Sequence, residues 1–151
     1  MDALMQGCVM PALSTFRKSE KAVEAAIQKA KDTGKLFVLF VADVDLALYF
    51  IEAELSPAMR EMCEADVLKL HEKEGRGKVE QIAAKARLEK IEMRSVIEVG
   101  QFAQVCLHQV ELEKPSLIVT TRSQRPEWVK KFFGAPVSEI IEKVECPVLV
   151  V

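Results

Sequence analysis

The polar residues best placed to bind a ligand follow a short apolar run late in the chain. The run Leu117 to Thr120 reads Leu-Ile-Val-Thr, and Thr121, Arg122, Ser123 and Arg125 come directly after or close behind it. Arginine forms paired hydrogen bonds with phosphate oxygens. In an open α/β sheet the loop after such a strand lies at the ligand crevice. These residue types therefore indicate an anion or nucleotide pocket with Thr120, Thr121, Arg122 and Ser123 at its floor.

The same loop has a plainer interpretation. Its second half reads Pro126-Glu-Trp-Val-Lys-Lys-Phe-Phe133, so Trp128, Val129, Phe132 and Phe133 can cover the core while the arginines point into water. Two arginines in an exposed loop are common, because arginine is mostly found at the surface. The sequence leaves both interpretations open.

Residues with metal-binding or nucleophilic chemistry are scattered elsewhere. The cysteines show no C-x-x-C spacing, and the two histidines lie far apart inside helical patterns. They are Cys8, Cys63, Cys106, Cys146, His71 and His108. We expect reduced thiols that act mainly as small apolar residues, satisfied or solvated histidines, and no metal site. No nucleophile stands at a readable spacing from a base, although side chains distant in sequence could converge.

A glycine-rich tetrapeptide resembles a phosphate-binding loop only superficially. Gly75-Arg-Gly-Lys78 follows no strand, and no serine or threonine comes after the lysine. Both features are needed in a Walker-type loop. We expect instead a solvated weak turn in a long helix over Asp66 to Lys90.

The remaining patterns supply the elements that must position these residues. Apolar runs of strand type alternate with segments of helical period, which predicts a parallel sheet with right-handed crossovers and helices on both faces. The predicted strands are Cys8 to Leu13, Leu36 to Ala42, Met93 to Val99, Leu117 to Thr120 and Val148 to Val151. The predicted helices start at Ser19 and stop at Gly34, span Asp66 to Lys90, start near Phe102 and end at Pro115, and cover Val137 to Val144. Pro11 removes a donor from the first strand, so we expect that strand to be short.

One segment fits neither pattern. Asp43 to Cys63 contains the apolar stretch Leu46 to Ile51 together with Glu52, Glu54 and Pro57. It is an irregular crossover packed on the core, or a lid or partner-binding segment. Apolar residues in connections usually pack on the core, which favours the first interpretation.

Length and composition limit the classes of function. The 151 residues fit one α/β domain over residues 1–151, and 50% of them are hydrophobic. The net charge of −2 provides no general attraction to nucleic acid or to anionic membrane. Met1 to Met10 lacks a basic n-region and a long apolar h-region, and no run approaches the length of a membrane span. We expect a cytoplasmic protein with no nucleic-acid or membrane partner.

Taken together, seven stretches of sequence resemble the universal stress protein family. They are Val-Met-Pro-Ala from Val9, Ser-Glu-Lys-Ala-Val-Glu-Ala-Ala from Ser19, Phe-Val-Leu-Phe-Val-Ala from Phe37, Val-Ile-Glu-Val-Gly from Val96, Leu-Ile-Val-Thr-Thr-Arg-Ser from Leu117, Gly-Ala-Pro-Val-Ser-Glu from Gly134 and the ending Cys-Pro-Val-Leu-Val-Val. The resemblance covers nearly the whole chain, and the ending is its most specific part. It implies a five-stranded parallel sheet of the Rossmann-like type. It also implies a homodimer paired through the last strand, Val148, Leu149, Val150 and Val151.

The resemblance points to the group of the family that lacks a standard ATP site. ATP-binding members carry Gly-x-x-Gly, nine residues, and then Gly followed by Ser or Thr. Here Thr120 and Ser123 occupy the two leading glycine positions, Gly134 follows after ten residues, and Ala135 replaces the hydroxyl residue. A Cβ at such a glycine restricts positive φ and close backbone approach to a ligand.

The first strand departs from the family pattern as well. The acidic residue that contacts the nucleotide in binding members falls near Ala12 or Leu13 here, where no carboxylate is present. Asp43 and Asp45 lie on the correct edge but not at the matching position. An altered pocket would be formed by Ala12, Leu13, Val41, Ala42, Thr120, Thr121, Arg122, Ser123, Arg125, Gly134 and Ala135.

Three functions remain open at this stage. The favoured one is a non-catalytic stress-response or regulatory protein that acts as a homodimer through protein contacts and has no cofactor. The second is a nucleotide-binding module that uses Arg122, Ser123 and Arg125 to bind ATP or AMP, with slow hydrolysis. The third is an unrelated α/β enzyme.

Overall fold

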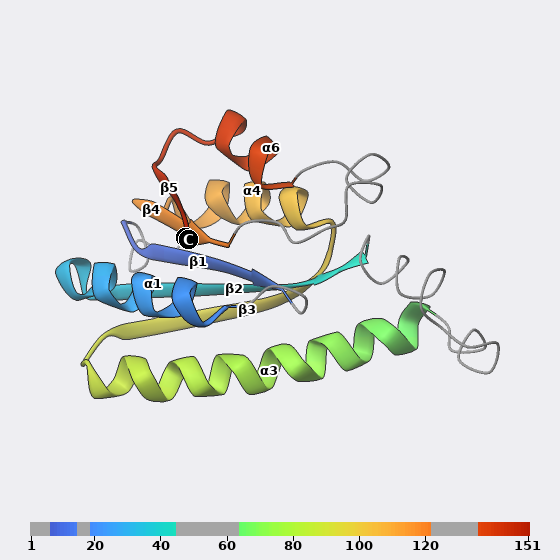
Figure 1. Ribbon diagram of the computed structural model, residues 1–151, viewed down its shortest axis with the longest axis horizontal. Helices are drawn as coiled ribbons and strands as arrows, with labels where there is room; N and C mark the ends of the chain where they lie inside the picture. Colours follow the sequence, from blue (N-terminus) through green and yellow to red (C-terminus); the bar gives the residue numbers. More distant parts are fainter. Residues whose placement is uncertain (1–6, 15–18, 45–63, 122–135) are drawn as a thin grey trace.

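Five strands and four helices alternate along the described part of the chain, which comprises residues 7–14, 19–44, 64–121 and 136–151 of a computed structural model (Figure 1). The strands are β1 (Val9–Ser14), β2 (Lys35–Asp43), β3 (Glu92–Gly100), β4 (Leu117–Thr120) and β5 (Val148–Val150). The helices are α1 (Glu20–Thr33), α3 (Glu64–Leu88), α4 (Phe102–Glu113) and α6 (Pro136–Lys143). Each predicted strand and helix is confirmed, with ends that differ by a few residues at most.

The strands form one sheet in the order β3-β2-β1-β4-β5, and every neighbouring pair is parallel. The chain therefore proceeds outward from β1 to β3 in one direction, then returns and proceeds from β4 to β5 in the other. The strand order reverses between β1 and β4. The predicted five-stranded parallel sheet with helices on both faces is confirmed.

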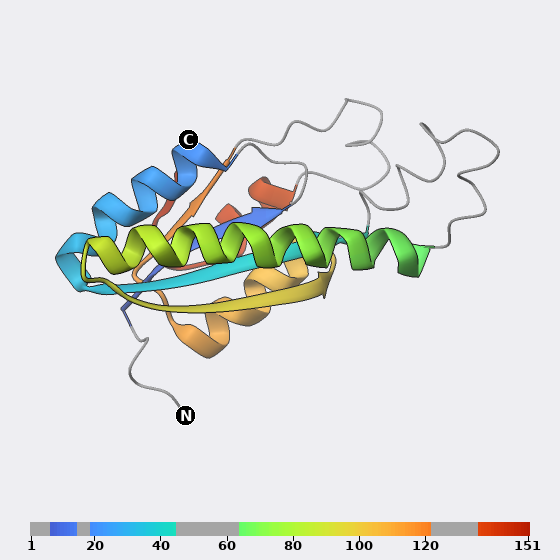
Figure 2. The ribbon, with the colours of Figure 1, turned by 90° about the horizontal axis from the view of Figure 1, so that it is seen from below.

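Two apolar cores lie on opposite faces of the sheet. Helices α1 and α3 cover one face, where Ala26 and Ile82 pack with Leu13 and Phe40 of the central strands. Helices α4 and α6 cover the other, where Phe102 and Ile140 are buried. Figures 1 and 2 show these two layers of helices on either side of the strands. Within β2, every residue from Leu36 to Asp43 is buried, because both of its faces are covered.

Helix α1 begins and ends at the predicted residues, but the predicted side-chain cap at its start is replaced by a backbone hydrogen bond. Gly34 takes a left-handed conformation with φ of 74°, and its N–H donates to Ala30 O at 2.6 Å. This glycine supplies the positive φ that such a helix end requires. Ser19 stands at the N-cap, but its side chain makes no capping hydrogen bond; its backbone carbonyl accepts from Val23 N instead.

Proline in the first strand does not shorten it as expected. Strand β1 spans six residues and lies at the centre of the sheet, with all six buried. Its register with β2 includes Val9 and then resumes at Ala12, so the pairing on that side passes over Met10 and Pro11. On the other side Pro11 lies opposite Val119. The missing donor interrupts one ladder locally while packing on both faces retains the strand.

The expected weak turn around Gly75 is wrong. Helix α3 runs unbroken for 25 residues, and Gly75 is buried against the sheet while Gly77 is exposed. A Cβ at position 75 would lie 2.4 Å from Cδ1 of Phe40, whereas a Cβ at position 77 would meet nothing within 4 Å. The first glycine therefore permits close helix–sheet packing, which a local helical pattern cannot show.

Some of the sequence interpretations fall outside the described residues. These are the roles of Leu46 to Ile51, of the crossover around Pro57, of Asp45, and of Trp128, Val129, Phe132 and Phe133. In the part of the chain that the structure describes, no helix combines the length and the apolar composition needed to cross a membrane.

Candidate functional site

The candidate site lies where the strand order reverses, at the carboxyl ends of β1 and β4. Diverging connections at such a point leave a crevice in open α/β sheets, and ligands bind there. Ser14 ends β1, while Thr120 ends β4 and Thr121 follows it. All three residues are buried. Asp43 ends the adjacent strand β2 and is also buried, so the described floor presents three hydroxyl groups and one carboxyl group.

A hydrogen bond joins the two sides of this crevice. The Thr120 hydroxyl donates to the backbone carbonyl oxygen of Ala12 across a distance of 3.0 Å, and both residues are fully buried. The Thr120 carbonyl oxygen in turn accepts from Val151 N at 3.0 Å. The side chain at the position of the first motif glycine is thus buried, and its hydroxyl bonds to the neighbouring strand β1.

The strand residues predicted for the pocket are core residues. Four of them have no solvent exposure: Ala12, Leu13, Val41 and Ala42. Leu13 packs in the core under α1 and α3, whereas Ala12 and Val41 pack in the core under α4 and α6. The structure thus places them in strands β1 and β2 as buried core residues, and Ala12 accepts the hydrogen bond from Thr120. The other predicted residues, Arg122, Ser123, Arg125, Gly134 and Ala135, lie outside the described residues.

The described floor is not a phosphate-binding set by itself. Phosphate sites use cationic side chains and backbone N–H groups that point at the ligand. Hydroxyl groups can supplement these, but the buried carboxyl group of Asp43 at the neighbouring strand end adds no attraction for an anion. The described floor therefore contains no cationic side chain that could hold a phosphate group.

Two residues near this edge were missed by sequence reasoning. Ser14 is fully buried, and its Oγ has no hydrogen-bond partner among the described residues. Its position directly after the first apolar run was the available signal. His71 of α3 is 8% exposed, and burial lowers its pKa while the carboxylates of Glu74 and Asp43 oppose that shift. No sequence pattern connects His71 with Asp43, because they lie on different elements.

The described cysteines have the properties of apolar residues. Burial raises the pKa of the Cys8 thiol to about 11, with a further contribution from the charge of Glu113. Burial also raises the pKa of Cys146. Both thiols are therefore protonated at neutral pH and poor nucleophiles. Among the described residues, no group of three His, Cys, Asp or Glu side chains could hold a metal ion.

The last strand offers an open edge. Val148, Leu149 and Val150 are half-buried, and among the described strands β5 pairs with β4 alone. Pro147 O accepts from Ile118 N, and Val151 N donates to Thr120 O, so these residues direct their backbone groups toward β4. Because backbone N–H and C=O groups point to alternate sides along a strand, those of Val148 and Val150 point away from β4, toward the open edge. This apolar edge carries no charged side chain, unlike β3 at the other edge with Glu92, Arg94 and Glu98.

Replacing Thr120 tests the bond across the crevice. Thr120→Val keeps the side-chain shape but removes the donor to Ala12 O, so we expect a loss of about 1 to 2 kcal/mol in unfolding free energy. Ser95→Ala, which removes an exposed hydroxyl group on β3, is the control and should change stability by less than about 0.5 kcal/mol. Chemical denaturation measures both. Equal losses of unfolding free energy at the two positions would contradict a stabilising role of the hydrogen bond from Thr120 to Ala12 O.

The buried histidine predicts a pH dependence of stability. Burial lowers the pKa of His71 below its ordinary value of 6.5, while Glu74 and Asp43 oppose the shift. The unfolded chain therefore binds this proton more strongly than the folded protein, and stability falls as the pH drops below about 6.5. Between about pH 7.5 and about pH 5, His71→Gln should lose less stability than the unchanged protein. Thermal melts with the exposed His108→Gln as control check this; parallel losses in all three proteins would contradict it.

Comparison with known proteins gives a family and a set of similar structures. The sequence model of the universal stress protein family matches residues 9–151. None of the curated proteins compared with the chain matches it. The structure of UspA from Lactobacillus plantarum is similar with a TM-score of 0.70 and 15% identity, over 97% of this chain and 98% of that one.

Two further similar structures contain nucleotides. A universal stress protein from Archaeoglobus fulgidus in complex with dAMP has a TM-score of 0.58 and 14% identity, over 96% of each chain. A universal stress protein in complex with cAMP also has a TM-score of 0.58 and 14% identity, over 97% of each chain. At these identities the likeness to solved structures establishes the fold and nothing more.

Proposed function

The chain belongs to the universal stress protein family, and on this basis we propose that it is a non-catalytic regulator of the stress response. In this proposal the protein has no nucleotide cofactor, forms a homodimer and acts through contacts with other proteins. One observation carries the proposal: at the position of the first motif glycine, Thr120 has a fully buried side chain whose hydroxyl donates to Ala12 O.

The residue at the first motif glycine position supports the absence of a standard ATP site. The family pattern has a glycine where this chain has Thr120, and a glycine there leaves room for a ligand to approach the backbone. The threonine instead uses its hydroxyl to bond within the sheet. A nucleotide that approached the backbone at position 120 would have to displace this fully buried side chain and leave Ala12 O without its hydroxyl donor, which costs about 1 to 3 kcal/mol.

The last strand supports the dimer. Its outward backbone groups and apolar side chains suit pairing with the same strand of a second copy, because a closed two-fold contact uses the same patch twice. Charged residues line the outer edge of β3, so that edge is the less favourable one for such pairing.

A nucleotide-binding module is the second candidate, and the relatives in complex with dAMP and cAMP favour it. In this version Arg122, Ser123 and Arg125 take over the contacts of the missing glycines and hold the phosphates of ATP or AMP, with slow hydrolysis.

Calorimetric titration separates the two candidates. We expect ATP with magnesium to give no binding heat up to millimolar concentration, because the buried side chain of Thr120 replaces a motif glycine and the described residues of the floor include no cationic group. Micromolar binding that is lost in Arg122→Ala would establish the second candidate instead. Arg94→Ala, at an exposed arginine on β3, is the control for loss of positive charge alone.

A further inference from the structure

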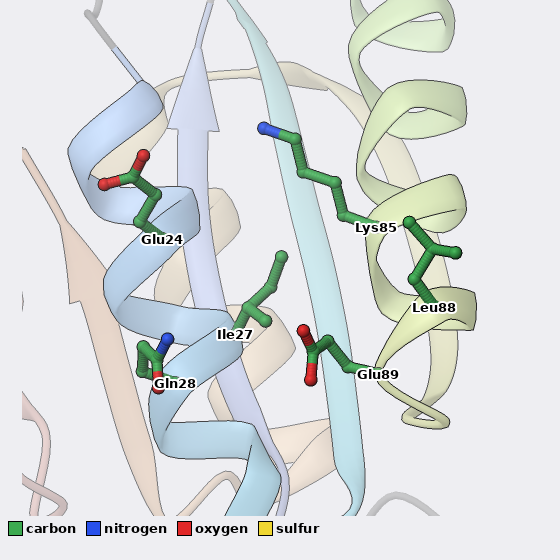
Figure 3. A pocket seen from close by; sticks show the side chains of 6 residues that line it. All are labelled: Glu24, Ile27, Gln28, Lys85, Leu88 and Glu89. Carbon is green, nitrogen blue, oxygen red and sulfur yellow. The ribbon is translucent and has the colours of Figure 1, made fainter.

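Helices α1 and α3 leave a groove between them on their face of the sheet. The groove has a volume of about 420 Å³ and is open to solvent. Glu24, Ile27 and Gln28 line it from α1, and Lys85, Leu88 and Glu89 line it from the end of α3 and the residue after it. Figure 3 shows the side chains of both helices around this space. We refer to it below as the α1/α3 groove.

The α1/α3 groove has an apolar floor and an apolar rim. Ile27 lies at its base with 8% exposure and packs in the core with Ala86. Leu88 has 84% of its surface exposed, the largest value among the exposed large hydrophobic residues of the described chain. An aliphatic side chain inserted between them would cover Leu88 and contact Ile27, and each buried CH₂ contributes about 0.8 kcal/mol.

The two walls carry opposite charges that have no partner among the described residues. Glu24 is on the α1 wall and Lys85 is on the α3 wall, and no ion pair joins either of them to another described side chain. Both groups lie toward the same end of the groove in Figure 3. Toward the other end the walls are joined by a bridge of 3.4 Å between Lys31 Nζ and Glu89 Oε2. An ion pair thus connects the two walls at one end of the groove. At the other end the carboxylate of Glu24 and the ammonium group of Lys85 lie on separate walls.

The shape and charges of the α1/α3 groove suit a helix of another protein better than a small molecule or a second copy of this chain. Five of the six lining residues are exposed, so a small molecule would lose little contact with water and gain little burial. A second copy related by a two-fold axis along the groove would bring Glu24 to Lys85, but it would set the ridges of the helices against each other and leave the groove unfilled. A single helix can insert its apolar stripe while its two flanks meet the two charged walls.

We propose that the α1/α3 groove binds an amphipathic helix of a partner protein. Its aliphatic stripe contacts Ile27 and Leu88, its cationic flank faces Glu24 and its anionic flank faces Lys85. This inference rests on the proposed action through protein contacts and names the surface that makes them. The complementary charges select the partner, because a wrong flank places like charges against each other.

Three synthetic helical peptides with one leucine stripe test the proposal. One carries lysine on one flank and glutamate on the other, one carries lysine on both flanks, and one carries glutamate on both. A helix can enter the groove in either direction, so the mixed peptide can always match both walls. Fluorescence anisotropy should show that the unchanged protein binds the mixed peptide about fivefold more tightly than either single-charge peptide.

Charge reversal makes the test specific to the groove. Glu24→Lys makes both walls cationic and should transfer the preference to the peptide with two glutamate flanks. Lys85→Glu should transfer it to the peptide with two lysine flanks. Glu111→Lys, on the exposed side of α4 over the opposite face of the sheet, should leave the order unchanged. Leu88→Asp should weaken all three peptides by about tenfold, since it removes the apolar rim.

Three outcomes would overturn the proposal. The first is equal binding of all peptides, and the second is an order that does not respond to Glu24→Lys or Lys85→Glu. The third is self-association, without peptide, that Leu88→Asp abolishes, because it would assign the groove to a second copy. None of these results bears on ATP binding or on pairing through β5, which calorimetry and the variants of the last strand test separately.

Discussion

A lysine at position 149 is expected to convert the homodimer into monomers. Leu149 lies in the middle of β5, half-buried and packed partly against the core under α1 and α3. In the proposed dimer two copies of this strand pair, so the substitution places two like charges in one apolar contact. Burying an unpaired charge costs several kcal/mol, so the dissociation constant should rise at least about a hundredfold. Sedimentation velocity measures the change.

Two companion variants separate loss of pairing from loss of folding. Val150→Pro removes a backbone N–H that points to the open edge and leaves the hydrogen bonds to β4 in place, so it should also give a folded monomer. Val99→Lys adds the same charge at the exposed end of β3, on the other edge, and should leave the association unchanged. A folded dimer in both Leu149→Lys and Val150→Pro would contradict pairing through the last strand.

Alanine at position 75 is expected to destabilise the fold strongly although it favours the helix. The added Cβ would overlap the Phe40 ring, whose atoms Cδ1, Cε1 and Cγ lie 2.4, 2.7 and 3.0 Å from it. Phe40 is fully buried in the central strand β2, and Lys78 Nζ lies 6.0 Å from its ring centroid on the same side. Overpacking costs about 1 to 3 kcal/mol and outweighs the gain of up to about 1 kcal/mol in helix propensity, so we expect a net loss of up to about 2 kcal/mol.

The same substitution two residues later provides the control. A Cβ at Gly77 meets no atom within 4 Å, so Gly77→Ala should stabilise the protein by up to about 1 kcal/mol. Urea denaturation of the two variants should therefore give effects of opposite sign. Phe40→Leu combined with Gly75→Ala should cost less than the sum of the two single changes, because the smaller side chain relieves the overlap. Gly75→Ala as stable as Gly77→Ala would disprove the close packing of α3 on β2.

Much of the fold could be predicted from local pattern. Apolar runs without alternation identified strands covered on both faces, as at Leu36 to Ala42, and Gly34 marked the end of α1 through its tolerance of positive φ. Contacts between elements that are distant in the sequence could not be predicted from local pattern. The burial of Gly75 depends on Phe40 in another strand, and the persistence of β1 through Pro11 depends on its neighbours and on packing from both sides.

The candidate site was predictable only in outline. Strand ends in a parallel sheet directed attention to Thr120 and Thr121, and both lie at the point where the strand order reverses. The bond from Thr120 to Ala12 O, the buried Ser14 and the proximity of His71 to Asp43 arise from pairing and helix packing, which no local spacing encodes. The α1/α3 groove likewise joins residues about 60 positions apart in sequence.

Native mass spectrometry of the purified protein tests the central claim most directly, because it reports the number of chains and any retained ligand together. We expect the mass of two chains of 16.9 kDa with no added nucleotide mass. Denaturation of the same sample should release no adenine nucleotide. A dimer carrying one nucleotide per chain, or a monomer at every concentration, would contradict a homodimeric regulator without a nucleotide cofactor.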